Sequence, residues 1–325
     1  MPSIPRPPLN PDLADAHKTA PLLEVSTPEQ RHPYRQHINS LFTVETTIKG
    51  KETTISYEER DIPGPAGPMR ATIFRPKHQT HEPADTPGIL HIHGGGLATG
   101  NRFLGLTVLD WVETFGAVCL TAEYRLAPEH PQPAALEDSY AALQWMSAHA
   151  AELGFNPGKL IVCGGSAGGN LAAGVTLLAR DRCGPQISGQ VLMYPWVDDR
   201  VDSLSMRQFG DIAPVTRANV LQVAEFAFGR EREYADMYTA PGRAKDLSGL
   251  PPTFVDVGEA DVFRDQDVAY AAALWRDGVS TELHVWPGSW HGFDVFVPDA
   301  TVSVRARAAR TEWLRKLLGS IDVKR

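Results

Sequence analysis

Several features are scarce or absent in this sequence, and each absence excludes a class of protein. Cysteine occurs three times in 325 residues, at spacings typical of neither a disulfide framework nor a metal or redox site, so we expect reduced thiols and a cytoplasmic protein. No apolar run approaches the roughly 18 residues that predict a transmembrane helix, so we expect no stable membrane insertion. The proline-rich residues 1–8 lack the apolar core of a secretory signal.

Positive charge is also in short supply. The chain has 31 Lys and Arg against 39 Asp and Glu, which gives a formal net charge of −8, and it has no basic cluster. Nucleic acid and anionic membrane surfaces are therefore not expected as partners. A small-molecule substrate is expected instead, and a homodimer stays open.

The sequence does contain enough apolar material for a large core. Hydrophobic residues make up 42% of the chain, and its length suits one large α/β domain. From residue 88 onward, short apolar strands alternate with helical segments, which predicts a mostly parallel twisted sheet with helices on both faces. We expect strands at 88–93, 117–123, 160–163, 189–193, 253–257 and 281–286, and helices at 104–115, 133–153, 170–182 and 265–278.

Two regions stand outside this alternation. Residues 1–50 are rich in Pro, His and charge with a helical signal at 28–41, and two hairpin strands follow at 53–62 and 69–75 around a turn at 63–68. Residues 196–250 carry no strand signal and interrupt the alternation. We therefore expect a core made of residues 51–195 and 251–325, a cap insertion at 196–250, and an N-terminal arm at 1–50 that forms part of the cap.

The most specific chemical signal is the segment from Ile161 to Asn170, in which an apolar strand runs into Gly164-Gly165-Ser166-Ala167-Gly168 and then a helix. Gly-x-Ser-x-Gly alone is a weak pattern. Between a strand and a helix, however, it predicts a sharp turn that exposes the serine hydroxyl at the sheet edge. We therefore expect Ser166 to be a catalytic nucleophile.

A second glycine motif follows the strand at 88–93. His93 is followed by Gly94, Gly95 and Gly96, and residues without side chains let the main chain aim its amides at a ligand. Acyl transfer builds negative charge on the substrate oxygen, which such amides stabilise. We expect the oxyanion hole to consist of the Gly95, Gly96 and Ala167 amides; the alternative is an ordinary glycine turn at the end of a strand.

An acid should come next along the chain, in a loop after a strand. Asp261 fits that place, with Glu259 as its main rival. Asp256 falls within the strand, while Asp265 and Asp267 suit the first turn of a helix, where a carboxylate complements the helix dipole.

The base should follow the last strand. His291 lies on that loop beside Gly292, whereas His284 lies in mid-strand. His91 and His93 alternate onto one strand face and resemble a metal pair, but no third ligand stands at a metal-like spacing. We therefore expect no metal and no cofactor.

One more block, from Tyr124 to Pro131, lies between the two glycine motifs. With these residues in place, the chain resembles the hormone-sensitive-lipase-like carboxylesterases of the α/β-hydrolase fold. The resemblance implies a metal-free serine esterase, with Ser166, Asp261 and His291 in the catalytic positions. Two positions depart from the family pattern: Gly165 replaces an acid or threonine, and Leu97 replaces an aromatic residue. The signatures occur in order at His93–Gly96, Tyr124–Pro131, Ser166–Asn170, Asp261 with Arg264 and Asp265, and His291–Phe293.

The sequence thus predicts an enzyme that hydrolyses short-chain or small carboxylic esters through an acyl-enzyme. A small-molecule amide or lactone hydrolase is the first alternative, because the chemistry is shared, and a non-catalytic ligand receptor is the second. Leu97, Trp196 and Phe209 are candidate walls of the substrate pocket. Arg264 and Asp265 are expected to form a structural ion pair beside the acid loop.

Overall fold

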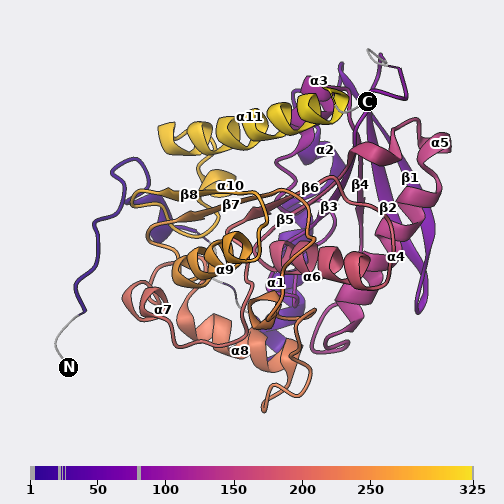
Figure 1. Ribbon diagram of the computed structural model, residues 1–325. Helices are drawn as coiled ribbons and strands as arrows, with labels where there is room; N and C mark the ends of the chain where they lie inside the picture. Colours follow the sequence, from indigo (N-terminus) through magenta and orange to yellow (C-terminus); the bar gives the residue numbers. More distant parts are fainter. Residues whose placement is uncertain (1–3, 21–22, 24, 26, 79–81, 324–325) are drawn as a thin grey trace.

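The computed structural model describes residues 4–20, 23, 25, 27–78 and 82–323, and its centre is a mixed β-sheet (Figure 1). Within these residues, eight strands pair in the order β1-β2-β4-β3-β5-β6-β7-β8. The pairs β1–β2 and β2–β4 are antiparallel and all others are parallel. The strands are β1 Ile55–Gly64, β2 Gly67–Pro76, β3 Gly88–Ile92, β4 Val118–Ala122, β5 Leu160–Gly165, β6 Gly189–Met193, β7 Thr253–Gly258 and β8 Thr281–Trp286.

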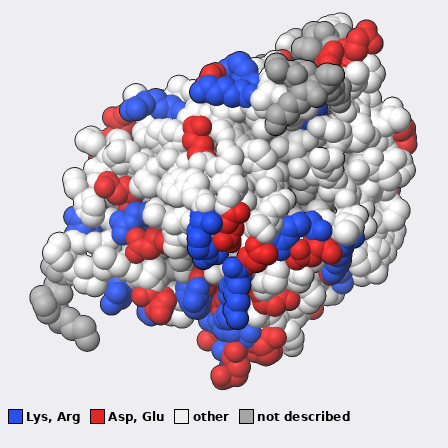
Figure 2. Space-filling view, viewed as in Figure 1, with Lys and Arg blue, Asp and Glu red and all other residues white. Residues whose placement is uncertain are grey.

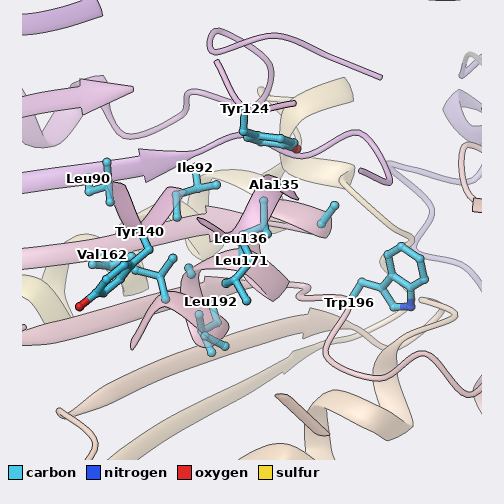
Figure 3. Packing of buried hydrophobic residues seen from close by; sticks show 14 of the residues in the cluster. Leu90, Ile92, Tyr124, Ala135, Leu136, Tyr140, Val162, Leu171, Leu192 and Trp196 are labelled. Carbon is cyan, nitrogen blue, oxygen red and sulfur yellow. The ribbon is translucent and has the colours of Figure 1, made fainter. Parts of the chain in front are cut away.

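Helices cover both faces of this sheet. On one face lie α3 (Leu109–Phe115) and α11 (Thr301–Val323), and on the other lie α4 (Ala134–Ala148), α6 (Ala167–Asp181) and α9 (Arg264–Arg276) (Figure 1). Every residue of β3, β4 and β6 is buried, as expected for strands covered on two sides. Leu90, Val162 and Leu192 meet Leu136 and Leu171 in the larger apolar core (Figure 3).

The hairpin is longer than the sequence predicts. The turn expected at 63–68 is wrong at both ends, because β1 and β2 continue to pair as far as Gly64 and Gly67. Only Pro65 and Ala66 remain in the connection, so a tight two-residue loop closes the hairpin.

Two helix predictions also need correction. The helix expected at 104–115 begins only at Leu109, and Gly105 adopts a left-handed φ of 69° that a right-handed helix cannot contain. The helix expected at 133–153 is divided into α4 and α5 (Ala150–Leu153) at His149, whose ring nitrogen Nδ1 lies 2.8 Å from the Trp145 carbonyl oxygen.

Between β6 and β7, the chain forms α7 (Leu204–Gln208), α8 (Arg217–Phe228) and the short helix η3 (Pro241–Arg243). The N-terminal helix α1 (Pro28–Leu41) lies beside α8, since the Arg31 guanidinium is 5.3 Å from the Phe226 ring and Asn219 Nδ2 donates to Leu23 O. The arm and the insertion therefore contact each other. No helix in the described part of the chain combines the length and apolarity that crossing a bilayer requires.

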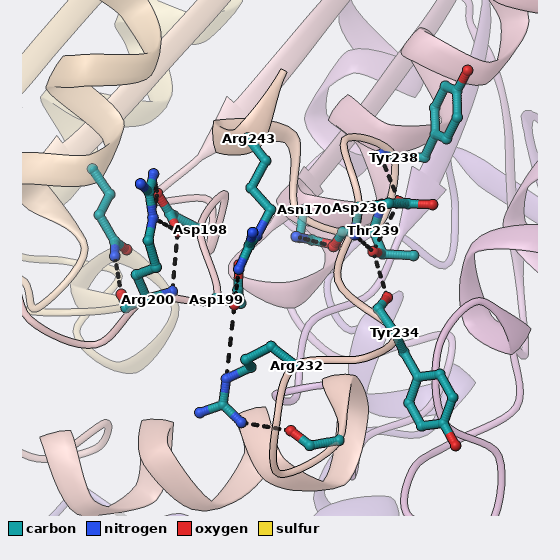
Figure 4. A network of polar contacts seen from close by, with 12 residues as sticks. Asn170, Asp198, Asp199, Arg200, Arg232, Tyr234, Asp236, Tyr238, Thr239 and Arg243 are labelled. Carbon is teal, nitrogen blue, oxygen red and sulfur yellow. Dashed lines mark hydrogen bonds and ion pairs between the residues drawn. The ribbon is translucent and has the colours of Figure 1, made fainter. Parts of the chain in front are cut away.

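Polar contacts join parts of the insertion to one another and to the core (Figure 4). The side chain of Asp199 is 1% exposed and pairs with Arg243 at 2.5 Å and with Arg232 at 3.7 Å. Asn170 of α6 donates from Nδ2 to the carbonyl oxygens of Trp196 and Thr239, at 2.8 and 2.9 Å. Trp196 at the start of the insertion and Thr239 farther along it are thus tied to α6, the helix that follows Ser166.

A buried ion cluster joins α11 to the sheet, and the sequence analysis did not foresee it. Arg310 bonds Asp256 of β7 (Nε to Oδ2, 2.9 Å) and Asp294 of α10 (Phe293–Phe296), and all three residues are at most 2% exposed. Burial raises the pKa of Asp256, and the guanidinium opposes that change. The single cation therefore compensates two carboxylates that have little access to water.

Replacing Arg310 should consequently destabilise the fold strongly. Arg310→Met leaves two buried carboxylates without a counter-charge, which costs about 3–5 kcal/mol in similar settings. We expect a large fall in the urea unfolding midpoint. The matched control is Arg315→Met on the same helix, whose pair with Glu312 is about half exposed and should contribute less than about 1 kcal/mol. Equal midpoints for the two variants would contradict the importance of the buried cluster.

Candidate active site

Ser166 lies at the tip of the turn between β5 and α6. Its φ of 58° and ψ of −121° are strained for a residue with a side chain. The Ser166 amide donates to Met193 O at 2.9 Å, and the Ser166 carbonyl accepts from Trp196 N at 3.0 Å. Contacts from the end of β6 therefore hold the turn in its strained geometry.

The glycines on both sides of Ser166 permit a very close approach of backbones. A Cβ at Gly164 would collide with the Gly168 carbonyl, and a Cβ at Gly168 would collide with the carbonyl oxygens of Ile92 and His93. Strands β3 and β5 and the start of α6 thus meet where only glycine fits.

Three side chains form one hydrogen-bonded row. His291 lies between the other two, with Nε2 2.9 Å from Ser166 Oγ and Nδ1 2.9 Å from Asp261 Oδ2. Asp261 is 1% exposed and His291 6% exposed, so the row is largely screened from water. The structure brings together the three residues that the sequence analysis selected, from loops after β5, β7 and β8.

The loop after β7 separates the two rival carboxylates. Asp261 Oδ1 accepts the Phe263 amide at 2.9 Å, which leaves Oδ2 facing His291. Glu259 Oε2 instead accepts the Gly288 amide at 2.9 Å. This carboxylate therefore joins the loop after β7 (residues 259–263, the acid loop) to the loop after β8 (residues 287–292, the histidine loop). Arg264 pairs with Asp265 at 2.9 Å, the ion pair expected from the sequence, and also donates to Glu259 O.

The glycine loop after β3 curls back on itself beside Ser166. Gly95 and Gly96 have φ values of 109° and 63°, and Gly95 O accepts the amides of Ala98 and Thr99. A Cβ at Gly95 would collide with the Thr99 carbonyl. This conformation requires glycine, and it places Gly95 and Gly96 on the wall of the cavity that Ser166 enters.

The two histidines at the end of β3 are buried, which favours the neutral form of both rings. Burial lowers the pKa of His91 to about 3 and that of His93 to about 4. His93 Nδ1 lies 2.8 Å from Gly94 O, and its ring stacks on Tyr124 with 4.0 Å between centroids. His93 therefore supports the glycine loop. Among the described residues, no three His, Cys, Asp or Glu side chains gather as a metal site would require.

Ser166 and His291 open into a cavity of about 280 Å³. Helix α1, helix α8 and the residues before α8 supply much of its apolar wall, and no described lining residue is Asp, Glu, Lys or Arg. Such a cavity suits an uncharged ligand, because a buried charge would find no partner there. The aliphatic and aromatic side chains that the N-terminal arm and the insertion before and within α8 contribute are Leu23, Tyr34, Ile38, Leu41, Phe42, Pro214, Val215, Val220 and Val223.

Of the three candidate walls, Trp196 lines this cavity, and Leu97 and Phe209 do not. Leu97 has a left-handed φ of 60° and a side chain in the main core, 1% exposed. Phe209 is fully buried in a separate cluster with Trp290. Those two predictions are therefore wrong: both side chains fill the interior beside the site.

Tyr194 is a wall residue that the sequence analysis missed. Its ring meets the His291 ring edge-on at 5.1 Å, and a Cβ at Gly165 would lie 3.1 Å from its Cε2 atom. The small residue before the nucleophile thus accommodates the tyrosine. The available signal was its place directly after β6, since ligands of parallel sheets bind at the carboxyl ends of the strands.

Comparisons with known proteins identify the family and the fold of this chain. A family model described as alpha/beta hydrolase fold matches residues 89–295. Esterase LipI from Mycobacterium tuberculosis is 35% identical over 252 residues, covering 74% of this chain and 76% of the relative. Carboxylesterase NlhH from the same organism is 40% identical over 217 residues, covering 64% of this chain and 66% of the relative.

Solved structures are similar over nearly the whole chain. A bacterial heroin esterase has a TM-score of 0.86 at 35% identity, covering 95% of this chain and 98% of that protein. Esterase LipW from Mycobacterium marinum has a TM-score of 0.85 at 32% identity, covering 96% and 98%. The fold and the family resemblance that the sequence predicted are confirmed. This chain belongs to the alpha/beta hydrolase family, in its hormone-sensitive-lipase-like group.

Proposed function

We propose that this chain is a serine carboxylesterase that hydrolyses small, uncharged carboxylic esters through an acyl-enzyme. The row Asp261–His291–Ser166, with both His291 hydrogen bonds at 2.9 Å, is the observation that carries the proposal. The similarity to proteins named esterase and carboxylesterase supports it. The apolar wall of the cavity supports the substrate class.

In the first half of the reaction, His291 Nε2 takes the proton from Ser166 Oγ as this oxygen attacks the ester carbonyl. Asp261 holds the imidazole in the required tautomer and stabilises the imidazolium that forms. The Gly95, Gly96 and Ala167 amides donate to the negative oxygen of the tetrahedral intermediate. Breakage of the ester C–O bond then releases the alcohol, which receives the proton from His291.

In the second half, water replaces the alcohol. His291 removes a proton from this water, whose oxygen attacks the acyl carbon, and the same amides hold the second oxyanion. The bond between the acyl carbon and Ser166 Oγ breaks, and His291 returns the proton to Ser166 Oγ. The carboxylic acid formed loses its remaining proton to solvent water and leaves as a carboxylate, which an apolar wall without Lys or Arg does not retain.

We further propose that residues 1–50 and 196–250 together cover a core made of residues 51–195 and 251–325. The pocket walls that α1 and α8 contribute support this division. A cytoplasmic location is consistent with three free cysteines, of which Cys183 is exposed. Acidic and basic side chains are interspersed on the face in Figure 2, which gives that face no broad basic area for nucleic acid.

Replacing the nucleophile should abolish turnover. We expect Ser166→Ala to reduce hydrolysis of an activated short-chain ester by about four to six orders of magnitude, because binding groups remain while the attacking oxygen is lost. A fluorophosphonate should label the wild type and Ser40→Ala, an α1 control, and leave Ser166→Ala unlabelled. Labelling at another residue would contradict the assignment.

Parallel assays of matched lactones and anilides test whether the enzyme is a lactone or amide hydrolase instead. Binding of these compounds without turnover of any of them would indicate a non-catalytic receptor.

The two carboxylates of the acid loop should differ sharply in effect. Asp261→Asn favours the wrong imidazole tautomer and should lower kcat by about 10⁴-fold. Glu259→Gln keeps an oxygen that can accept the Gly288 amide, so its kcat should fall by less than about tenfold. Steady-state kinetics with one nitrophenyl ester would measure both, and the opposite ranking would identify Glu259 as the acid.

Acyl-chain preference should favour short esters. A cavity of about 280 Å³ is at the small end of ligand sites, so acyl chains of about two to six carbons should be turned over faster than longer ones. Ile38→Ala removes part of the α1 wall and should shift the optimum toward longer chains. Ile48→Ala, which alters an isoleucine outside the wall, should not. Faster turnover of twelve- to sixteen-carbon emulsified esters by the wild type would contradict the short-ester preference.

A further inference from the structure

The N-terminal arm has a section that does not line the cavity. The lining residues of the arm begin at Leu23, whereas the described residues 4–20 contribute none. Residues 5–13, here termed the strap, run instead along the end of β8 (Figure 1). We propose that the strap positions His291 for catalysis and has no part in substrate selection. This inference rests on the proposed esterase activity and concerns a different section of the arm from the pocket wall.

The strap binds the histidine loop directly. The Asn10 amide donates to Gly288 O at 2.9 Å, and Trp290 Nε1 donates to Leu13 O at 3.1 Å. Gly288 has a φ of 60°, and a Cβ there would collide with the backbone of Asn10. The strap therefore touches the loop backbone to backbone at Gly288, three residues before His291, and accepts the indole N–H of Trp290, one residue before it.

Apolar contacts extend this attachment to both sides of the histidine. Leu13 and Trp290 are fully buried in a cluster with Phe293, Ala260 and Phe209. Trp290 and Phe293 flank His291 in the sequence, and Ala260 precedes Asp261. Burying Leu13 among them restrains the backbone of the acid loop and of the histidine loop at once.

Polar contacts close a ring around the two loops. Gln208 of α7 donates to Pro5 O at 2.6 Å and accepts from Arg264 Nη2 at 2.9 Å. Arg264 also donates to the Glu259 carbonyl oxygen. The Glu259 carboxylate accepts the Gly288 amide, and the Gly288 carbonyl oxygen accepts the Asn10 amide. The strap from Pro5 to Asn10 completes this ring. A shift of the acid loop relative to the histidine loop would therefore break at least one hydrogen bond of the ring.

Such bracing matters because a displacement of about 1 Å at a reacting group can cost about 100-fold in rate. Ser166 is fixed within the fold, but His291 lies on a loop beyond the edge strand β8. A loosened loop would lengthen the His291–Ser166 hydrogen bond while leaving unchanged the part of the cavity wall that α1 and α8 supply. The strap should therefore affect kcat more than KM.

The first test is Leu13→Ala in the full-length protein. We expect kcat for a nitrophenyl ester to fall about 10- to 100-fold, with KM changed less than about threefold and the acyl-chain profile unchanged. Labelling by a fluorophosphonate should slow by a similar factor, and Leu13→Met should restore most of the rate. The matched control is Leu153→Ala, a buried leucine of α5, which should lose comparable stability and keep its kcat.

The second test keeps the inference falsifiable if Leu13→Ala does not fold. Trp290→Phe removes the bond to Leu13 O together with part of a buried ring, and its control Trp275→Phe removes the same groups from a half-exposed tryptophan that donates to Thr281 O at 2.9 Å. We expect a lower kcat in the first variant and not in the second. The proposal would be overturned if Leu13→Ala had the same kcat as Leu153→Ala, or Trp290→Phe the same kcat as Trp275→Phe. A changed acyl-chain profile with an unchanged kcat would also overturn it. An inactive wild type would instead refute the esterase activity itself.

Discussion

The close approach of three backbones at Gly164 and Gly168 is the constraint on which the site depends. No side chain fits between β3, β5 and the start of α6, so the chain must turn sharply, and the turn forces Ser166 into a left-handed φ. Hydrogen bonds to Met193 and Trp196 then hold that geometry. The position of the serine oxygen is thus set by neighbouring strands of the sheet, which are the most rigid part of such a domain.

The histidine is held in a different way. Its loop follows an edge strand and depends on partners from distant parts of the sequence: Glu259 on the acid loop, Arg310 of α11 through Asp294, and the strap. One reacting group therefore rests on the local geometry of a turn, and the other on several long-range contacts. This asymmetry explains why the site tolerates large connections between its members and still places Ser166 Oγ and His291 Nε2 2.9 Å apart.

The parts that sequence could predict are those with local causes. A strand, Gly-x-Ser-x-Gly and a helix define the turn at Ser166, and position after a strand was enough to choose Asp261 and His291. Leu97 and Phe209 could not be placed, because their directions depend on a left-handed φ and on the docking of the strap. The Arg310 cluster was equally hidden, since an arginine in an amphipathic C-terminal segment normally faces water.

The origin of the cavity wall has a consequence for how such enzymes diversify. The wall residues of α1 and α8 belong to segments that contribute none of the three hydrogen-bonded groups. Substitutions at these wall positions therefore alter molecular recognition more than proton transfer. Substitutions after β8 affect both, because Gly292, Val295 and Phe296 also line the cavity. Selection or laboratory recombination can therefore act on recognition separately. A library confined to wall positions such as Tyr34, Ile38 and Val220 would sample new specificities, provided that Arg35, which donates to Ala98 O in the glycine loop, is kept.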